Sequence, residues 1–291
     1  MTTGRAASIH ARLLNRAKER GEDFNLLLTR YGIERFLYRL SQLPAREVLL
    51  LKGALLFDLW FDVPHRPTRD ADFLGFGPKD AEALATTIRD ICVVVAVDDG
   101  MVFDPESIAV EEIREDARYG GLRVRLLGKL GNARVTLQLD VGYGDAVTPG
   151  PEEAEYPTLL EDMPAPRLRT YPRASVVAEK LEAIVSLGMG NSRMKDYFDL
   201  RAMAREGALD EKLLGEAIAA TFDRRRTAIP PRAPLGLSEE FWRDATKLAQ
   251  WRAFKSRNRL DAPELEAVAR EIYDFVEKPL AIARRLSGAK R

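Results

Sequence analysis

Cysteine is almost missing from this sequence, and histidine is nearly as scarce. The 291 residues include one cysteine, Cys92, and two histidines, which excludes a disulfide framework and a zinc site built from several cysteines. No apolar run approaches the roughly 20 residues of a membrane-spanning helix. The N-terminal segment carries Arg5 and Arg12 without an apolar core, unlike a secretory signal. We therefore expect a cytoplasmic protein that does not associate with membranes.

Net charge is also lacking, because 45 Lys and Arg are balanced by 45 Asp and Glu. This balance excludes a uniformly basic nucleic-acid coat and a highly charged disordered chain. The charges are nevertheless segregated along the chain. Residues 1–69 carry 12 basic and 7 acidic groups, residues 70–164 carry 8 and 20, and residues 165–260 carry 19 and 12. Such clustering either only keeps a protein soluble or marks a cleft in which basic flanks face an acidic centre.

The apolar pattern predicts an α+β protein, with a mixed β-sheet and helices in the N-terminal half and a helical C-terminal half. Apolar residues recur at helical spacing in the first forty residues, and short apolar or alternating runs after them predict strands. The clearest strand signal is a hairpin formed by Leu122–Leu127 and Arg134–Val141. Further strands are expected at 47–51, 70–76, 93–97 and 108–113, and helices at 54–60 and 79–91.

Proline marks the expected division of the chain. Six prolines fall within 145–172, which predicts an irregular linker. We expect a helical lead-in over 1–46, an α/β core over 47–165 and a helical domain over 166–291. The helices expected after the linker are at 174–188, 192–206, 209–222, 238–256 and 263–285.

Carboxylates are the first candidates for chemistry. Asp70 and Asp72 alternate along a predicted strand, so both project from the same face. Two neighbouring carboxylates repel each other unless a cation neutralises them, and oxygen ligands suit a hard ion such as Mg²⁺. Asp140, on the polar side of the hairpin, can add a metal ligand or accept a proton from an attacking hydroxyl. Each of the three is also typical of a solvated strand end.

Groups suited to phosphate lie beside these acids. Lys52-Gly53-Ala54 is expected at a strand-to-helix corner, where free backbone N–H groups bind anions and glycine permits a close approach. The same three residues also fit an ordinary turn. Arg69 directly precedes Asp70 and either reaches phosphate oxygens or balances charge.

Basic groups in the C-terminal half are candidates for binding RNA. An aromatic residue among cations suits a phosphodiester strand or an exposed base, although cations at a helix end also complement the helix dipole. Trp251, by its helical spacing from Trp242, is more typical of a core residue. The candidate cations are Arg224, Arg225 and Arg226 in a proline-rich loop, with Arg252 and Lys255 beside Trp251.

The order of these motifs resembles the nucleotidyltransferases of the DNA-polymerase-β-like fold. Two helical motifs, Glu179-Lys180-Leu181-Glu182 and Arg193–Leu200, make the chain similar to the AbiEii/AbiGii-type toxins in particular. The resemblance runs from about residue 48 to 258. Ala54 stands where the family usually has serine, so a hydroxyl contact to phosphate is lost, whereas backbone contacts are kept.

This resemblance implies a Mg²⁺-dependent nucleotidyltransferase that uses a nucleoside triphosphate. It places Lys180 at the triphosphate and makes Asp196 functionally required. From the residues alone, Lys180 can neutralise phosphate charge or pair with a neighbouring glutamate. Asp196 can act directly or be a buried partner of Arg193 or Lys180.

The biological role is likewise implied by the resemblance. It points to the toxin of a toxin–antitoxin or phage-defence pair, with a cognate antitoxin encoded nearby. It also indicates RNA as the acceptor, in particular the 3′ end of tRNA, so that translation is blocked. Two alternatives stay open: transfer to a small molecule or protein hydroxyl, and a catalytically inert module that binds a nucleotide or a partner.

Overall fold

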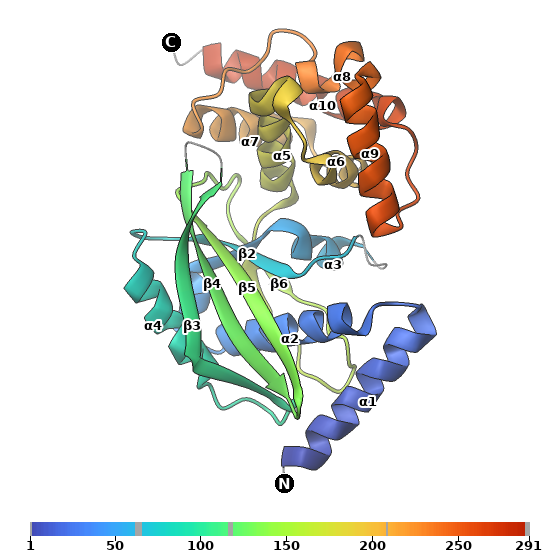
Figure 1. Cartoon of the computed structure of the whole chain (residues 1–291). Helices are drawn as coiled ribbons and strands as arrows, with labels where there is room; N and C mark the ends of the chain where they lie inside the picture. The colour runs from blue at the N-terminus through green and yellow to red at the C-terminus, as the bar shows by residue number, and fades with distance from the viewer. Residues whose placement is uncertain (1, 62–65, 116–118, 208, 289–291) are drawn as a thin grey trace. The chain divides into compact units, whose positions relative to one another are not determined.

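The contacts of the chain divide it into two compact units (Figure 1). The structure is a computed structural model, and it describes residues 2–61, 66–115, 119–207 and 209–288. Unit 1 comprises Met1–Gly144 and Glu152–Thr170, and unit 2 comprises Asp145–Pro151 and Tyr171–Arg291.

Unit 1 is built on a seven-stranded mixed sheet in the order β3-β4-β5-β2-β1-β7-β6. β2 pairs in parallel with β5, and β1 in parallel with β7, while the other neighbours are antiparallel. The long strands β3, β4 and β5 form one side of this sheet (Figure 1). The strands are β1 Leu49–Lys52, β2 Asp70–Gly75, β3 Met101–Glu115, β4 Tyr119–Leu130, β5 Ala133–Tyr143, β6 Glu152–Glu155 and β7 Arg167–Thr170.

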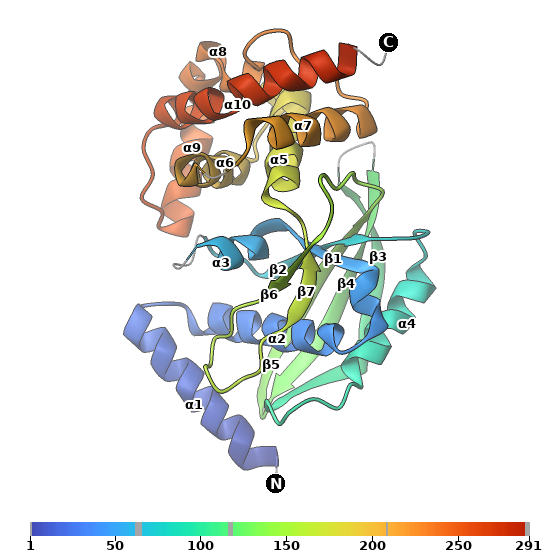
Figure 2. The ribbon, with the colours of Figure 1, turned by 180° about the vertical axis from the view of Figure 1, so that it is seen from behind.

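Helices pack against this sheet, α2 on β5 and α4 on β3 (Figure 2). Asp23 and Asp80 cap the N-termini of α2 and α4 by accepting backbone N–H groups of the first turn, as aspartate commonly does. Gly32 lets α2 approach closely, because a Cβ there would lie 3.0 Å from the Leu137 side chain. The helices of unit 1 are α1 Thr2–Arg20, α2 Phe24–Ser41, α3 Phe57–Trp60 and α4 Ala81–Cys92.

Unit 2 is helical, and its core lies between α10, α7, α6 and α5. Tyr197 stacks on Phe241 at 5.3 Å between ring centroids. Trp251 is fully buried and donates its indole N–H to the carbonyl of Pro263, so the prediction that it belongs to the core is confirmed. The helices are α5 Arg173–Leu187, α6 Met194–Glu206, α7 Glu211–Arg224, α8 Glu239–Arg243, α9 Ala245–Asn258 and α10 Leu265–Gly288.

The α+β class predicted from the sequence is confirmed. The hairpin is present and longer than expected, because β4 and β5 pair from Leu122↔Val141 to Leu130↔Ala133. Its alternation places Leu137 and Leu139 in the core and leaves the intervening polar residues on the other face. None of the described helices combines the length and hydropathy that crossing a bilayer requires.

The strand expected at 93–97 is wrong, because this stretch lies in the connection between α4 and β3. Val93 is the C-cap of α4, and its side chain and that of Val95 are exposed. Valine favours strands only where a pleated surface half-buries it. Here no such surface covers the run, so its β-propensity is not realised.

The irregular linker expected at 145–172 is also wrong in part, because it contains β6 and β7. The two strands pair with each other, and Leu51↔Thr170 joins them to the sheet through β1. The prolines fall outside the strands, where their missing N–H breaks no ladder hydrogen bond. Leu168 and Thr170 alternate into the core, a signal too short to stand out among six prolines.

The helix expected at 238–256 is divided in two at Asp244. This residue has an extended backbone and accepts the backbone N–H of Lys247, so it ends α8 and caps α9. The helix expected at 54–60 is likewise shorter. Residues Gly53–Leu56 form a 3₁₀ turn and only Phe57–Trp60 are α-helical.

A buried carboxylate on α2 makes the stability of unit 1 dependent on pH. Glu34 is 1% exposed, lies 2.6 Å from Arg35 and accepts the backbone N–H of Leu159. Burial raises the pKa of Glu34 to about 7, although Arg35 opposes the shift. Protonated Glu34 therefore contributes stability below about pH 4.5 that is lost as the pH rises through about 7.

We accordingly expect Glu34→Gln to flatten the pH dependence of stability. Between about pH 4.5 and 7 the native protein should lose about 3 kcal/mol of unfolding free energy relative to this variant. Urea unfolding at a series of pH values measures the difference. Glu19→Gln, on the exposed side of α1, is the control and should follow the native curve. Parallel curves for all three proteins would contradict the assignment.

Candidate active site

Four charged side chains lie side by side across the sheet of unit 1. Lys52 ends β1 and pairs in register with Asp72 on β2. Asp72 pairs with Asp140 on β5, and Asp140 with Arg123 on β4. Residues in register share a face of a sheet. The row therefore holds two carboxylates in the centre with a cation at each end.

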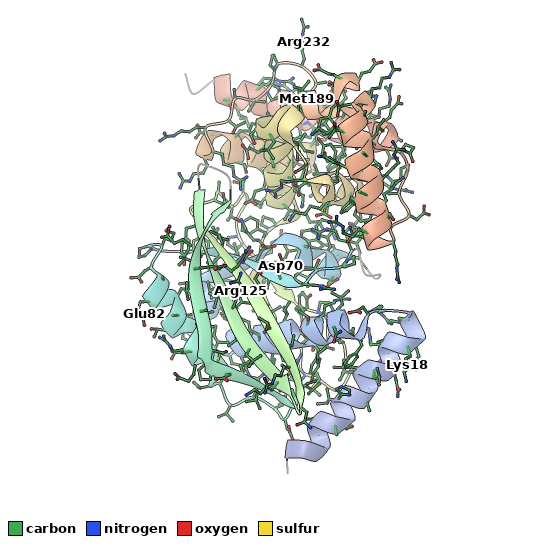
Figure 3. The ribbon with its side chains drawn as sticks, in the orientation of Figure 1. Lys18, Asp70, Glu82, Arg125, Met189 and Arg232 are labelled. Carbon is green, nitrogen blue, oxygen red and sulfur yellow. The ribbon has the colours of Figure 1, made fainter. Side chains whose placement is uncertain are left out.

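Asp70 adds a third carboxylate to this centre. It lies two residues before Asp72 on the same face of β2, and its register neighbour on β5 is Gln138, which in turn pairs with Arg125 on β4. Figure 3 labels Asp70 and Arg125. Asp70, Asp72 and Asp140 each offer an oxygen within 4.8 Å of the others. The three carboxylates predicted to act together are thus brought together.

The chemistry of these donors fits a hard divalent cation. All three are carboxylates, and Asp140 is only 7% exposed. Three carboxylates at this separation repel one another unless a cation lies among them. Mg²⁺ takes oxygen ligands and keeps positions for water or substrate phosphate. The triad can therefore hold a metal ion.

The Lys52-Gly53 corner lies directly against the triad. Gly53 has a φ of +76°, and a Cβ on it would lie 2.0 Å from the Asp72 Oδ2. Lys52 Nζ lies near the end of β5, 3.7 Å from where a Cβ on Gly142 would be. The corner thus brings backbone and an ammonium group next to the carboxylates, as a phosphate site requires.

We expect Gly53→Ala to damage this site selectively. The new methyl group has no room beside Asp72, and alanine at this positive φ is strained by about 1–2 kcal/mol. Activity at this site should fall strongly, and the unfolding free energy should fall by this strain together with the cost of displacing the Asp72 side chain. Gly77→Ala, also at a positive φ but with open space around its Cβ, is the matched control. Equal activities of the two variants would contradict the proposed role of Gly53.

Arg123 is a site residue that the sequence did not reveal. Its Nε and Nη2 donate to the two oxygens of Asp140 at 2.8 and 2.7 Å. Hydrogen bonding to Asp140 raises the pKa of Arg123 above its usual range, although burial opposes the shift. The amide of Gln138 donates to the same carboxylate at 3.3 Å. Only the register of β4 with β5 could have indicated this contact.

Arg69, the other residue of unit 1 predicted to bind phosphate, is exposed. It immediately precedes Asp70 at the start of β2. Ala54 lies in the 3₁₀ turn rather than in a long helix, so this corner lacks the dipole of an extended helix and relies on its local N–H groups.

Lys180 and Asp196 are partners within unit 2. Lys180 Nζ donates to Asp196 at 2.8 Å and to Asp199 at 2.7 Å, and Arg193 donates to Asp196 at 2.7 Å. Both aspartate side chains are 0% exposed. Burial opposes ionisation of Asp196, but Lys180 and Arg193 outweigh it and lower the pKa of this carboxyl. Lys180 thus pairs with two aspartates of α6.

Arg225 lies in a cluster of carboxylates. Its guanidinium lies 3.0 Å from Asp145, 2.9 Å from Glu182 and 3.5 Å from Glu179. The side chain is 18% exposed. Its charge is therefore already paired within unit 2, which reduces what it offers to an RNA strand.

The remaining RNA candidates differ in exposure. Arg224, Arg226 and Arg252 are exposed. Lys255 instead donates to the carbonyl of Ala262 and to Glu264, contacts that hold the end of α9.

Residues 35–276 match the family model described as nucleotidyl transferase AbiEii toxin, type IV toxin–antitoxin system. The chain belongs to this family. The AbiEii match includes the Lys52-Gly53 corner and the acidic triad of unit 1, and also Lys180 and Asp196 of unit 2. The protein is therefore a nucleotidyltransferase of a toxin family.

Two crystal structures of Helicobacter pylori proteins are similar over most of their length. JHP933 is 16% identical, with 91% of this chain and 95% of that chain covered and a TM-score of 0.49. A second protein, described as a nucleotidyltransferase, is 17% identical, with 89% of this chain and 96% of that chain covered and a TM-score of 0.47. No curated protein matches this AbiEii-family chain.

Proposed function

We propose that this nucleotidyltransferase moves a nucleoside monophosphate from a nucleoside triphosphate to an RNA hydroxyl, with Mg²⁺ as its metal. The acceptor is the 3′ end of tRNA, and its modification blocks translation. The observation that carries the proposal is the cluster of Asp70, Asp72 and Asp140 beside the Lys52-Gly53 corner. Carboxylates that can hold a metal next to a phosphate-binding corner suit transfer of a charged phosphoryl group.

The residues of unit 1 divide the work. Lys52 and the backbone at Gly53 and Ala54 bind the triphosphate, and Arg69 adds a further cation. Asp70 and Asp72 hold the metal, which when bound stabilises charge on the attacking and leaving oxygens. Asp140 completes the ligand set and positions the acceptor hydroxyl, whose proton it accepts. The acceptor oxygen bonds to the α-phosphorus as the bond to pyrophosphate breaks, and pyrophosphate leaves with the electron pair.

Unit 2 supplies the RNA-binding and remaining functional residues of this proposal. Exposed cations at Arg224, Arg226 and Arg252 suit a phosphodiester backbone. The family resemblance gives Lys180 a role in nucleotide binding, and Asp196 holds Lys180 in place through their 2.8 Å ion pair. The functional roles of Lys180 and Asp196 are carried over from the family resemblance.

Transfer of α-labelled nucleotides to tRNA tests the function. The purified protein is incubated with Mg²⁺ and each α-labelled triphosphate in turn, together with total tRNA. We expect label on tRNA, and no label when periodate has destroyed its 3′ diol. Label on a protein or a small molecule, and none on tRNA, would show that the proposed acceptor is wrong. Absence of transfer to any acceptor would overturn the proposed function.

A cognate antitoxin is the expected cellular partner of this AbiEii-family chain. We propose that induction of the protein arrests growth and that co-expression of the antitoxin gene encoded beside it restores growth. Incorporation of labelled amino acids before and after induction measures translation. Growth arrest with undiminished protein synthesis would contradict the proposed block of translation.

A further inference from the structure

The third carboxylate of the triad is already bound by a cation of the protein itself. Arg123 uses two nitrogens to hold both oxygens of Asp140, at 2.8 and 2.7 Å. Side-by-side donation of this kind is among the stronger hydrogen-bonded arrangements in proteins. Asp140 is 8% exposed at its side chain and Arg123 is 29% exposed, so the carboxylate lies deeper than the cation that holds it.

A divalent cation at the triad has to share this carboxylate with Arg123. Guanidinium and metal both approach along the lone pairs of the carboxylate oxygens. Arg123 also repels a second cation placed among Asp70, Asp72 and Asp140, whose oxygens lie within 4.8 Å of one another. Arg123 stays protonated at every pH at which the protein is folded, so acid–base chemistry does not remove this competition.

The strand next to β4 offers Arg123 another partner. Glu111 on β3 is its register neighbour, and the charge of Glu111 contributes to the raised pKa of Arg123. Glu111 is at present 2.9 Å from Arg125, which lies two residues further along the same face of β4. Arg123 can therefore leave Asp140 and still be near a carboxylate.

We propose that Arg123 is a built-in counter-ion that competes with the divalent metal for Asp140. Without nucleotide it keeps the triad at low metal affinity. The triphosphate supplies additional oxygen ligands and negative charge, so metal and nucleotide bind together and Arg123 moves off Asp140. This inference rests on the proposed function, because it assumes that the triad is the metal site. Arg123 is thus a positioning residue that couples metal binding to nucleotide binding.

Titration of the nucleotide-free protein with Mn²⁺ tests the proposal, because the spectrum of free Mn²⁺ reports binding without any turnover. Arg123→Gln should bind Mn²⁺ about tenfold more tightly than the native protein, since one positive charge next to the site is removed. Arg123→Lys keeps the charge but not the pair of hydrogen bonds to Asp140, and its Mn²⁺ affinity should lie between those of the native protein and Arg123→Gln. Lys129→Gln removes a cation that lies further along β4 and contacts Asp104, so it leaves both the Arg123–Asp140 pair and Glu111 unchanged and should bind like the native protein.

A nonhydrolysable triphosphate provides the second measurement. It should tighten Mn²⁺ binding to the native protein by a larger factor than to Arg123→Gln, in which the competitor is already gone. Circular dichroism checks that each variant is folded. If Arg123→Gln is unfolded, the comparison is made with Arg123→Lys instead. Asp72→Asn combined with Arg123→Gln should lose the tight site, which locates it at the triad.

The possible outcomes separate this proposal from the function on which it rests. Equal or weaker Mn²⁺ binding by Arg123→Gln would overturn the role of Arg123 and leave the proposed function standing. Absence of Mn²⁺ binding by the native protein and all variants would overturn both. Arg123→Gln could bind Mn²⁺ more tightly while the native protein transfers nucleotide to no acceptor. That result would support the role of Arg123 and overturn the proposed function.

Discussion

Asp72→Asn is expected to lower the rate of nucleotidyl transfer by at least about a thousandfold. Asp72 lies in the centre of the charged row, in register with Lys52 on one side and Asp140 on the other. Its carboxylate faces the Gly53 corner so closely that a Cβ there would be 2.0 Å away. Metal stabilisation of the transferring group supplies several kcal/mol, and about 4 kcal/mol corresponds to a thousandfold in rate.

The same substitution should leave the fold intact. Asp70, Asp72 and Asp140 crowd negative charge within 4.8 Å, and removing one charge relieves repulsion between them. Because Asp72 also lies in register with the cation Lys52, part of this relief is offset, and we expect the unfolding free energy of Asp72→Asn to stay close to that of the native protein. Sites that gather like charges for function commonly behave in this way.

Matched variants make the measurement specific. Asp70→Asn should lose transfer as Asp72→Asn does, whereas Glu112→Gln removes an exposed acid from β3 and should keep the native rate. The rate is read from label transferred to tRNA under single-turnover conditions. A native rate in Asp72→Asn would show that the triad does not carry the reaction.

The site could be predicted in part because its members lie close together in sequence or on an obvious hairpin. Alternation placed Asp70 and Asp72 on one face, and the polar side of the second hairpin arm indicated Asp140. The sequence could not show that β2 pairs in parallel with β5. A helix and two strands lie between β2 and β5 along the chain, and a pairing so distant leaves no local pattern.

Arg123 is a second residue whose role could not be predicted from local sequence. A single arginine on an exposed strand face is ordinary, and its meaning comes only from its register with Asp140. Local signals failed in a different way at β7. Leu168 and Thr170 are buried, but a four-residue strand between prolines has too short an alternation to be recognised. Both the role of Arg123 and the formation of β7 depend on partners from distant parts of the chain, namely Asp140 and β1.

In unit 2 the sequence left two roles for Asp196, and stability measurements distinguish them. Asp196→Asn should cost about 3–5 kcal/mol of unfolding free energy, because it breaks a buried ion pair from one side. Lys180 would keep Asp199 at 2.7 Å but lose Asp196 at 2.8 Å. Arg193 would lose the carboxylate that it now contacts at 2.7 Å. Urea unfolding followed by tryptophan fluorescence, to which buried Trp251 contributes, measures the loss.

The pH dependence has a definite sign. The pKa of Asp196 is lowered in the folded protein by Lys180 and Arg193 despite burial. Its contribution is therefore present above the ordinary value of 3.8 and is lost as the pH falls through the folded-state pKa. Asp196→Asn should lack this contribution at neutral pH, and its disadvantage relative to the native protein should shrink in acid.

A double substitution separates pairing from direct action on the substrate. Lys180→Met with Asp196→Asn removes both charges of the pair, so it should cost less than the sum of the two single changes. Lys195→Gln, an exposed neighbour on α6, should have almost no effect on unfolding. If Asp196 instead acted only on the substrate, Asp196→Asn would abolish transfer with an unchanged unfolding free energy. Alternatively, Asp196→Asn lowers stability and activity together, and the double substitution costs less stability than the sum of the single changes but stays inactive. That result would show that the buried pair holds Lys180 in place.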